Sequence, residues 1–391
     1  MFKPVKLTTF NKFLTSHLAS SLLLFACLVL SLVIANSSLG LGFIELLDTA
    51  VGFSFGSIHI NYSIAIWIND GLMAVFFLLV GLEIKRELIE GELSTPKKAM
   101  LPIICALGGA MVPAVIYFIF NNGKPTAGGW GIPMATDIAF ALAILSLLGD
   151  KVPVSLKIFL AALAIVDDLL AILVIAVFYS AELHYMNLIY AGLIFLVLLL
   201  FNKFGIKHLA FYIIPGLVMW YLVHHSGIHA TIAGVLLALT LPTAKLADQS
   251  PLEKLEHWLT HPVNFIIIPI FALANTNIRF EPAMFAGLFT GLGMGIVLGL
   301  VIGKPVGIFL VSWVTVKLKI TQLPKNSEWK HMLGIGLLAG IGFTMSIFIS
   351  LLSFSGTSLV AEAKFSILTA SVISGILGYT VLLFSGKNED M

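Results

Sequence analysis

The stretch KIFLAALAIVDDLLAILVIAVF, residues 157–178, decides the fold of this chain. It is apolar except for Lys157 at its start and the adjacent aspartates Asp167 and Asp168 near its middle. A helix needs about 20 mostly apolar residues to cross the hydrocarbon core of a bilayer, and this stretch is long enough. The sequence therefore predicts a transmembrane helix that carries two neighbouring carboxylates close to mid-membrane.

The composition of the whole chain also indicates a membrane protein. It is 59% hydrophobic and 11% charged, with a mean hydropathy of +1.04, whereas a soluble domain has roughly a quarter charged residues. We expect one membrane domain over residues 1–391 with no separate soluble module, no removable signal peptide and no nucleic-acid partner. Cys27 and Cys105 lie in apolar runs and are predicted to be buried free thiols.

Hydrophobic runs separated by polar residues predict an all-α polytopic protein with twelve transmembrane helices. Lys and Arg residues give an independent test, because cytoplasmic loops are enriched in them. With a cytoplasmic N-terminus, 18 of the 22 cations fall on the cytoplasmic side and only Lys124, Arg279 and Lys364 fall outside. Both termini are therefore predicted to be cytoplasmic. The predicted spans are 14–36, 62–85, 98–120, 126–148, 154–180, 186–202, 208–224, 228–242, 254–276, 286–316, 331–354 and 361–385.

The first outer loop, residues 37–61, is the longest and has no Lys or Arg. Its stretch FSFGSIHIN, residues 53–61, alternates around Gly56, which is typical of a short β-hairpin. Alternation over so few residues is also compatible with an irregular loop, and the sequence leaves both open.

Five ionisable residues lie inside the predicted spans: Asp70, Asp137, Asp167, Asp168 and Lys304. Each costs about 2.5–3.5 kcal/mol near the bilayer centre, so pairing, a wet cavity or protonation must compensate. Such residues can also form buried ion pairs that only join helices. For Asp70, near the start of its helix, a structural ion pair or an interfacial position is the expected interpretation.

The adjacent pair Asp167 and Asp168 favours ion exchange instead. Neighbours on an α-helix point about 100° apart, so the two cannot share one cation symmetrically. Burial and like charge both disfavour a doubly ionised pair. Carboxylate oxygens suit a hard cation such as Na⁺ or Li⁺, so a proton and a metal ion would compete for one site. Lys304 is the obvious counter-ion, and the sequence leaves open whether it is a structural partner or a second proton carrier.

Two predicted spans contain helix-breaking residues. The fourth holds GGWGIPMATDIAF, residues 128–140, where Pro133 disfavours an intact helix. The eleventh holds GIGLLAGIGFTMS, residues 334–346, with four glycines. These are the middle helices of two three-helix sets, 3–5 and 10–12, which twelve spans place in opposite orientation, as in inverted-repeat transporters. If the breaks meet, Asp137 would offset the positive helix ends and Lys304 the negative ones.

These stretches resemble the NhaA-type sodium/proton antiporter family. The similar segments lie in the family's order along most of the chain. They are FFLLVGLEIKREL (76–88), GIPMATDIAFALAIL (131–145), LAIVDDLLAI (163–172), SGIHATIAG (226–234), PLEKLEHWLTHPV (251–263), LVIGKPVGI (300–308) and GIGFTMSIFI (340–349). One departure is FALANTNI (271–278), where the family has a small Ala-Gly pair after the asparagine.

The resemblance implies an inner-membrane transporter, not an enzyme, that exchanges cytoplasmic Na⁺ or Li⁺ for external protons. It places the ion site at Asp167 and Asp168, supported by Asp137, Thr136 and Lys304. It also implies a homodimer joined by the hairpin of the first outer loop, membrane lipid as surroundings, and no cofactor or soluble organic substrate. Two adjacent carboxylates that release two protons as one cation binds would make the exchange electrogenic.

The family is activated at alkaline pH. The resemblance therefore implies pH-sensing residues near the cytoplasmic ends of two helices and near the outer end of another. The competing interpretation is ordinary interfacial charge for the cytoplasmic positions and a packing histidine for the outer position. The matching positions are Glu83, Arg86, Glu87, Glu256, His257 and His261 on the cytoplasmic side and His229 on the outer side.

Three other functions fit the sequence less well. A sodium-coupled solute symporter would need an organic-substrate pocket, and no aromatic or arginine cluster lies at mid-depth. An intramembrane aspartyl protease would need carboxylates from two facing helices, whereas Asp167 and Asp168 adjoin on one helix. A channel is the third, but the sequence has no selectivity-filter signature.

Overall fold

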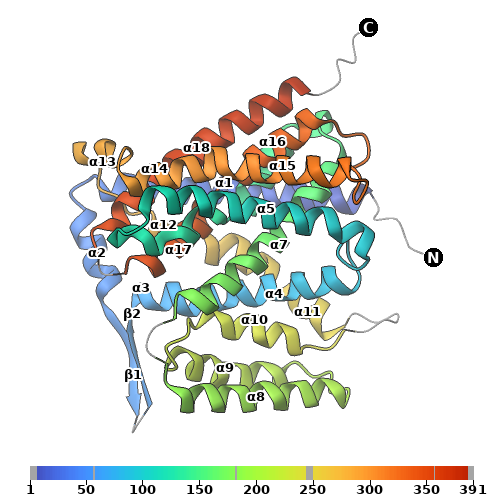
Figure 1. The fold of residues 1–391 in the computed structure, drawn as a ribbon. Helices are drawn as coiled ribbons and strands as arrows, with labels where there is room; N and C mark the ends of the chain where they lie inside the picture. Colours follow the sequence, from blue (N-terminus) through green and yellow to red (C-terminus); the bar gives the residue numbers. More distant parts are fainter. Residues whose placement is uncertain (1–6, 56–57, 181–182, 244–249, 356, 386–391) are drawn as a thin grey trace. The chain divides into compact units, whose positions relative to one another are not determined.

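The structure is a computed structural model that describes residues 7–55, 58–180, 183–243, 250–355 and 357–385. Its described part is mostly helical (Figure 1). The chain divides into two compact units. Unit 1 contains residues 1–26, 95–171 and 280–391, and unit 2 contains residues 27–94 and 172–279. The single membrane domain expected for the whole chain stays a prediction.

Unit 1 unites the two three-helix sets that the sequence singled out. Within it, α15 packs on α5 and α16, and α16 packs on α18. Helices α1 and α7 also continue into unit 2. Its elements are α1 (Leu7–Ala35), α5 (Pro96–Asn121), η2 (Pro125–Met134), α6 (Ile138–Leu147), η3 (Gly149–Lys151), α7 (Val154–Phe178), α13 (Pro282–Gly287), α14 (Gly291–Leu298), η5 (Gly299–Gly303), α15 (Lys304–Lys317), α16 (Trp329–Ala339), α17 (Phe343–Ser353) and α18 (Leu359–Ser385).

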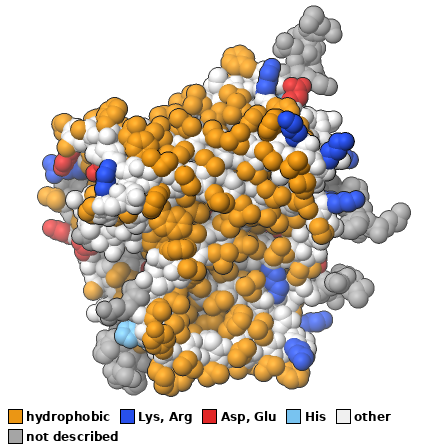
Figure 2. Space-filling view, viewed as in Figure 1, with side chains coloured by type: hydrophobic (Ala, Val, Ile, Leu, Met, Phe, Trp, Pro, Cys, Tyr) orange, Lys and Arg blue, Asp and Glu red, His pale blue; other side chains and the backbone are white. Residues whose placement is uncertain are grey.

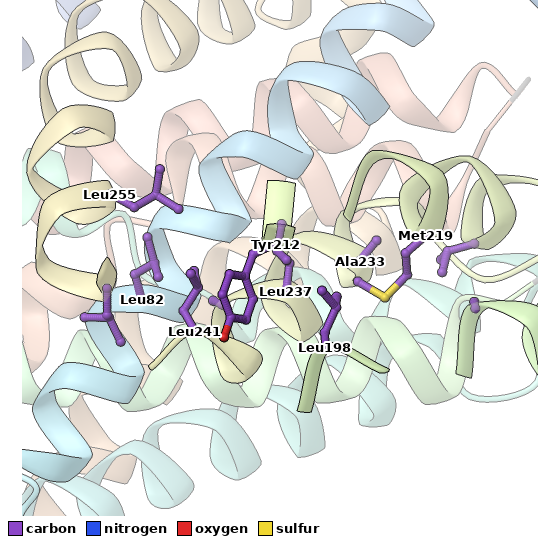
Figure 3. Close-up of a cluster of buried hydrophobic side chains, with 12 residues drawn as sticks. Leu82, Leu198, Tyr212, Met219, Ala233, Leu237, Leu241 and Leu255 are labelled. Atoms are coloured by element: carbon purple, nitrogen blue, oxygen red, sulfur yellow. The ribbon is translucent and has the colours of Figure 1, made fainter. Parts of the chain in front are cut away.

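Unit 2 has its own apolar core, drawn in Figure 3, in which Leu82, Leu198, Tyr212 and Met219 are buried. Here α4 packs closely on α10, and α8 packs on α9. Its elements are α2 (Gly40–Asp48), β1 (Ala50–Phe55), β2 (Ile58–Ser63), α3 (Ile64–Ile66), η1 (Trp67–Leu72), α4 (Met73–Ile89), α8 (Tyr185–Lys203), α9 (Ala210–His224), α10 (Thr231–Thr240), α11 (Pro251–Pro262), η4 (Val263–Ile267) and α12 (Ile268–Asn275).

The helices agree with a polytopic membrane protein. Of the described residues, nine segments are long and apolar enough to cross a membrane, and the bent pair α16 and α17 makes a tenth. The shorter apolar helices α9 and α10 correspond to the predicted seventh and eighth spans. Hydrophobic side chains cover most of the visible face in Figure 2, as expected when lipid is the solvent. The all-α polytopic class is therefore confirmed. Cys27 and Cys105 are both free, and Cys105 is buried as predicted, whereas Cys27 is only partly buried.

Both predicted interruptions are present. Residues Pro125–Met134, which include Pro133, form a 3₁₀ helix, Ala135 is extended, and a regular helix starts only at Ile138. The second break separates α16 from α17, whose axes differ by 45°. The missing N–H of Pro133 and the glycines of the eleventh span account for these positions.

The segment predicted as the first outer loop, residues 37–61, contains a β-hairpin, so the strand interpretation is the correct one. Strands β1 and β2 are antiparallel, with Ala50 opposite Ser63 and Phe53 opposite Ile60. The turn at residues 56–57 lies outside the described residues. The ends of the chain, residues 1–6 and 386–391, also lie outside them, so the predicted cytoplasmic placement of both termini stays a prediction.

Candidate ion-exchange site

The two helix breaks meet inside unit 1. The backbone N–H of Asp137, in the first break, donates to the carbonyl of Ile341 in the second, with 2.6 Å between N and O. A lipid interior offers no water to free backbone groups, so each break needs partners from protein. Direct pairing of the breaks provides one of these partners.

Asp137 accepts hydrogen bonds from the N-termini of both half-helices. Its Oδ1 lies 3.2 Å from the N–H of Phe140 in the first turn of α6. Its Oδ2 lies 3.0 Å from the N–H of Thr344 in the first turn of α17, and the Thr344 hydroxyl donates to the same oxygen. One carboxylate therefore caps two helix N-termini, where negative charge is stabilised. The predicted role of Asp137 at the positive ends agrees with this geometry.

The two C-terminal ends at the breaks are also covered. The Lys304 ammonium donates to the carbonyl of Met134, the last residue of η2. The Thr136 hydroxyl donates to the carbonyl of Ala339, the last residue of α16, over 2.8 Å. Cations and donors are stabilising at helix C-termini, as the sequence predicted for Lys304.

We call the two helix breaks and the side chains bonded to them the frame. Asp167 is the carboxylate bonded to this frame. Its Oδ2 forms an ion pair with the Lys304 ammonium and is the alternative acceptor of the single Thr136 hydroxyl proton, with 2.6 Å between the two oxygens. Its Oδ1 has no hydrogen-bond partner among the described residues. Asp167 is 3% exposed and Lys304 is fully buried. Lys304 is thus the counter-ion of a buried carboxylate, as expected.

Asp168 follows on α7 and is also buried, at 4% exposure. It interacts electrostatically with Lys304, but the short ion pair of Lys304 is with Asp167. The two neighbours on one helix therefore do not share the cation symmetrically. The structure brings Thr136, Asp167, Asp168 and Lys304 together at one buried location.

Three residues of this frame were not predicted as site residues. Thr344 binds Asp137, the Ser346 hydroxyl donates to the carbonyl of Ile132 over 2.7 Å, and Ser371 accepts from the N–H of Phe343 at 3.2 Å. Hydroxyl residues directly after a glycine-rich break were a usable signal for Thr344 and Ser346. Ser371 lies in the middle of a long helix, where the sequence gives no such signal.

The residues matched to pH sensing do not form one cluster. Arg86 pairs with Glu256 at 2.9 Å and with Glu87 at 3.1 Å, and Glu83 interacts electrostatically with these groups. His257 and His261 lie on exposed positions of α11. His261 stacks on Phe265, so its described contact is with an aromatic ring.

His229 belongs to a separate polar group in unit 2. Its Nε2 lies 3.4 Å from one oxygen of Asp70, and the Nδ1 of His224 lies 3.0 Å from the other. Trp220 stacks on His224 and donates to the Asp70 carbonyl. Asp70 is therefore a structural partner of two histidines, in agreement with the structural ion pair expected for it.

Interrupted helices that meet beside a buried carboxylate–ammonium pair define a polytopic secondary transporter, in which ions bind where helices are discontinuous. The comparisons give the particular family. A family model described as Na⁺/H⁺ antiporter 1 matches residues 11–382, and the chain belongs to this family, whose members are transporters and not enzymes.

Two relatives agree with this assignment, and one solved structure shares the fold. The chain is 62% identical over 390 residues to Na⁺/H⁺ antiporter NhaA 2 of Flavobacterium johnsoniae, covering 100% of this chain and 96% of that protein. It is 51% identical over 379 residues to Na⁺/H⁺ antiporter NhaA of Flavobacterium psychrophilum, covering 97% of each. The sodium proton antiporter MjNhaP1 of Methanocaldococcus jannaschii has the same fold, with a TM-score of 0.51, 16% identity and 95% of each chain covered.

The double cap by Asp137 generates a stability prediction. Asp137→Ala removes the acceptor of both half-helix N-termini, at about 0.5–2 kcal/mol for each cap. Asp137→Asn keeps one side-chain oxygen and should restore one cap. We expect Tm in detergent to fall in the order wild type, Asn, Ala. An alanine variant as stable as wild type would contradict the double cap.

Proposed function

We propose that the chain exchanges cytoplasmic Na⁺ or Li⁺ for external protons across the bacterial inner membrane. The observation that carries this proposal is the buried pair Asp167 and Asp168 beside Lys304, inside the frame of the two helix breaks. The family and the names of the relatives support the same exchange.

The chemistry of the exchange follows from the arrangement of oxygens. A desolvated Na⁺ would bind the carboxylates of Asp167 and Asp168 together with the Thr136 hydroxyl, all of which are oxygen ligands suited to a hard cation. In the structure the Asp167 Oδ2 is engaged by Lys304, so the arriving ion competes with the ammonium. The arriving Na⁺ displaces one proton from Asp168 and one from Lys304. When the Na⁺ leaves, both protons return and the restored ammonium again pairs with the Asp167 carboxylate.

A solute symporter is not favoured. The buried polar side chains of the site serve the helix breaks and one ammonium, and the relatives are named antiporters. Transport by this proposal needs the protein and its two cargo ions, without a cofactor or an organic substrate.

The deciding experiment uses everted membrane vesicles with a pre-formed proton gradient. Wild type should collapse the gradient when Na⁺ or Li⁺ is added, and Asp167→Asn or Asp168→Asn should abolish this response, because either loses a titrating cation ligand. The matched control Asp70→Asn removes a helix carboxylate that binds histidines instead and should retain exchange. Near-normal exchange by both site variants would refute the assignment of the site.

We further propose that the exchange is electrogenic, with two protons entering for each cation that leaves. One net charge per cycle couples transport to voltage by about 2.3 kcal/mol per 100 mV. In proteoliposomes clamped with valinomycin and K⁺, the exchange rate should therefore depend on the imposed potential. The same rate at all potentials would show an electroneutral cycle.

Activation at alkaline pH is proposed to depend on the ion-pair cluster of Arg86, Glu87 and Glu256, with Glu83 beside it. Glu256→Gln removes the carboxylate that holds Arg86, so the pH profile of exchange should shift or flatten while the maximal rate persists. The control Lys254→Gln neutralises an exposed charge of the same helix and should leave the profile unchanged. An unchanged profile for Glu256→Gln, measured from about pH 6.5 to about pH 9, would exclude this cluster as the sensor.

We also propose that the hairpin of β1 and β2 joins two copies in a homodimer. Val51 and Phe53 are exposed apolar side chains of β1, and an exposed strand edge is a natural place for pairing between chains. Native mass spectrometry of the protein with and without residues 50–63 would test it: a dimer that survives the deletion excludes the hairpin as the contact.

A further inference from the structure

The helix turn that carries Lys304 has an unusual hydrogen-bond pattern. Residues Gly299–Gly303 form a π-turn, in which the N–H of Lys304 donates to the carbonyl of Gly299 five residues earlier. The next residue, Pro305, has no N–H to donate. The carbonyl of Leu300 would be served by residue 304 in an α-helix or by residue 305 in a π-helix, so neither of these bonds is available to it.

A buried hydroxyl without a described partner lies at the same place. Ser374 on α18 is 0% exposed, and its hydroxyl has no hydrogen-bond partner among the described residues. A Cβ added at Gly340, in the break between α16 and α17, would meet the Leu300 oxygen and would lie 2.8 Å from the Ser374 Oγ and 3.1 Å from the Leu337 oxygen. Three oxygens from three elements therefore surround Gly340.

These oxygens pack tightly against Gly340 itself. A water molecule on their side away from Gly340 would give all three a hydrogen-bond partner. Buried polar groups are nearly always hydrogen-bonded, and orphans indicate an unseen water or ion. A water could accept from the Ser374 hydroxyl and donate to the carbonyls of Leu300 and Leu337, which gives the usual number of about three bonds for a buried water. The Leu337 oxygen already accepts from the N–H of Gly340, and a carbonyl has a second lone pair to offer. The three oxygens belong to two carbonyls and a hydroxyl, and the lack of a carboxylate among them favours neutral water over a cation.

We propose that Ser374 is a positioning residue for the ion-exchange site, acting through this water. The water ties the Leu300 carbonyl to α18 and to the break at Gly340, and so fixes the π-turn immediately before Lys304. A shift of this turn would move the Lys304 ammonium away from the Asp167 carboxylate. The inference rests on the proposed exchange at Asp167, because its effect is measured through that site.

The first test compares two buried serines of α18. Ser374→Ala should raise the apparent KM for Na⁺ by about fivefold, since it leaves a buried acceptor poorly satisfied next to the site, and should shift the pH of half-maximal exchange. The control Ser366→Ala removes a fully buried hydroxyl that donates to the Glu362 carbonyl of its own helix. It should leave both quantities unchanged. Equal kinetics for the two variants would overturn the proposal.

A second substitution tests whether Ser374 acts through the Leu300 carbonyl, and not merely whether position 374 tolerates alanine. Pro305→Ala returns an N–H that can donate to the Leu300 carbonyl, so the same serine change should matter less in this background. We expect the KM increase caused by Ser374→Ala to fall from about fivefold to below about twofold, a coupling that a double-mutant cycle reports. A full fivefold increase in the Pro305→Ala background would show that Ser374 does not act on Leu300.

The bound molecule can be observed directly. A map of the full-length protein that resolves ordered waters should show a peak bonded to the Ser374 Oγ in wild type and lose or weaken it in Ser374→Ala. Crystals soaked in Tl⁺ as a heavy substitute for an alkali ion should give no anomalous peak there. An empty position, or a Tl⁺ peak, would overturn the assignment to water.

Failure of this inference is distinguishable from failure of the proposed function. If wild-type vesicles show no Na⁺-dependent proton flux, the exchange itself is wrong, whatever the map shows. If wild type exchanges ions and Ser374→Ala behaves as Ser366→Ala does, only the positioning role is wrong.

Discussion

Unpaired backbone groups inside a lipid solvent are the constraint on which this structure depends. An interrupted helix exposes N–H and C=O groups, and in a bilayer protein must satisfy them. Here each break serves the other: Asp137 bonds across to Ile341 and its carboxylate takes N–H donors from both half-helices. The charged and hydroxyl side chains at the two breaks of unit 1 therefore satisfy the backbone, and the proposed ion exchange would use residues that the fold already needs.

The same constraint explains why Asp167 and Lys304 are tolerated. A buried ion pair is stable only when its remaining donors and acceptors are also satisfied. Lys304 bonds to the Met134 carbonyl as well as to Asp167, and Thr136 bridges Asp167 to the end of α16. One Asp167 oxygen is nevertheless left without a described partner. This incomplete satisfaction is what a site that must release its occupant requires, because a fully satisfied carboxylate would have no reason to bind a passing ion.

The sequence predicted these features because they are expensive. Charges in apolar runs, a proline with an aspartate four residues later, and glycines within a span each carry a cost that demands a function. Residues that carry no evident energetic cost inside a membrane helix could not be found in this way. Ser371 and Ser374 are ordinary in a membrane helix, and their roles arise only when α18 packs beside the second break. The predicted seventh and eighth spans proved to be short helices, and a short apolar run can be a buried core helix as well as a membrane span. Glu256 contacts Arg86 whereas His257 is exposed, because successive residues of a helix occupy different faces.

The buried Lys304–Asp167 pair and the ion-pair cluster around Arg86 differ in how readily pH can change their protonation. The Lys304–Asp167 pair has side-chain exposures of 0% and 1%, and breaking such a pair costs about 3–5 kcal/mol. The Arg86 side chain is 38% exposed while its partners Glu87 and Glu256 are 14% and 15% exposed. Ion pairs in contact with water contribute only about 0–1 kcal/mol, so protonation of one carboxylate there can change the arrangement without threatening the fold. In the proposed exchange the buried pair opens only when a cation takes the place of the Lys304 ammonium at Asp167, whereas an ion pair that is partly in contact with water can respond directly to the pH of the surrounding solution. The distribution of exposure in this chain therefore favours exchange at the buried pair and regulation at the cluster around Arg86 on energetic grounds.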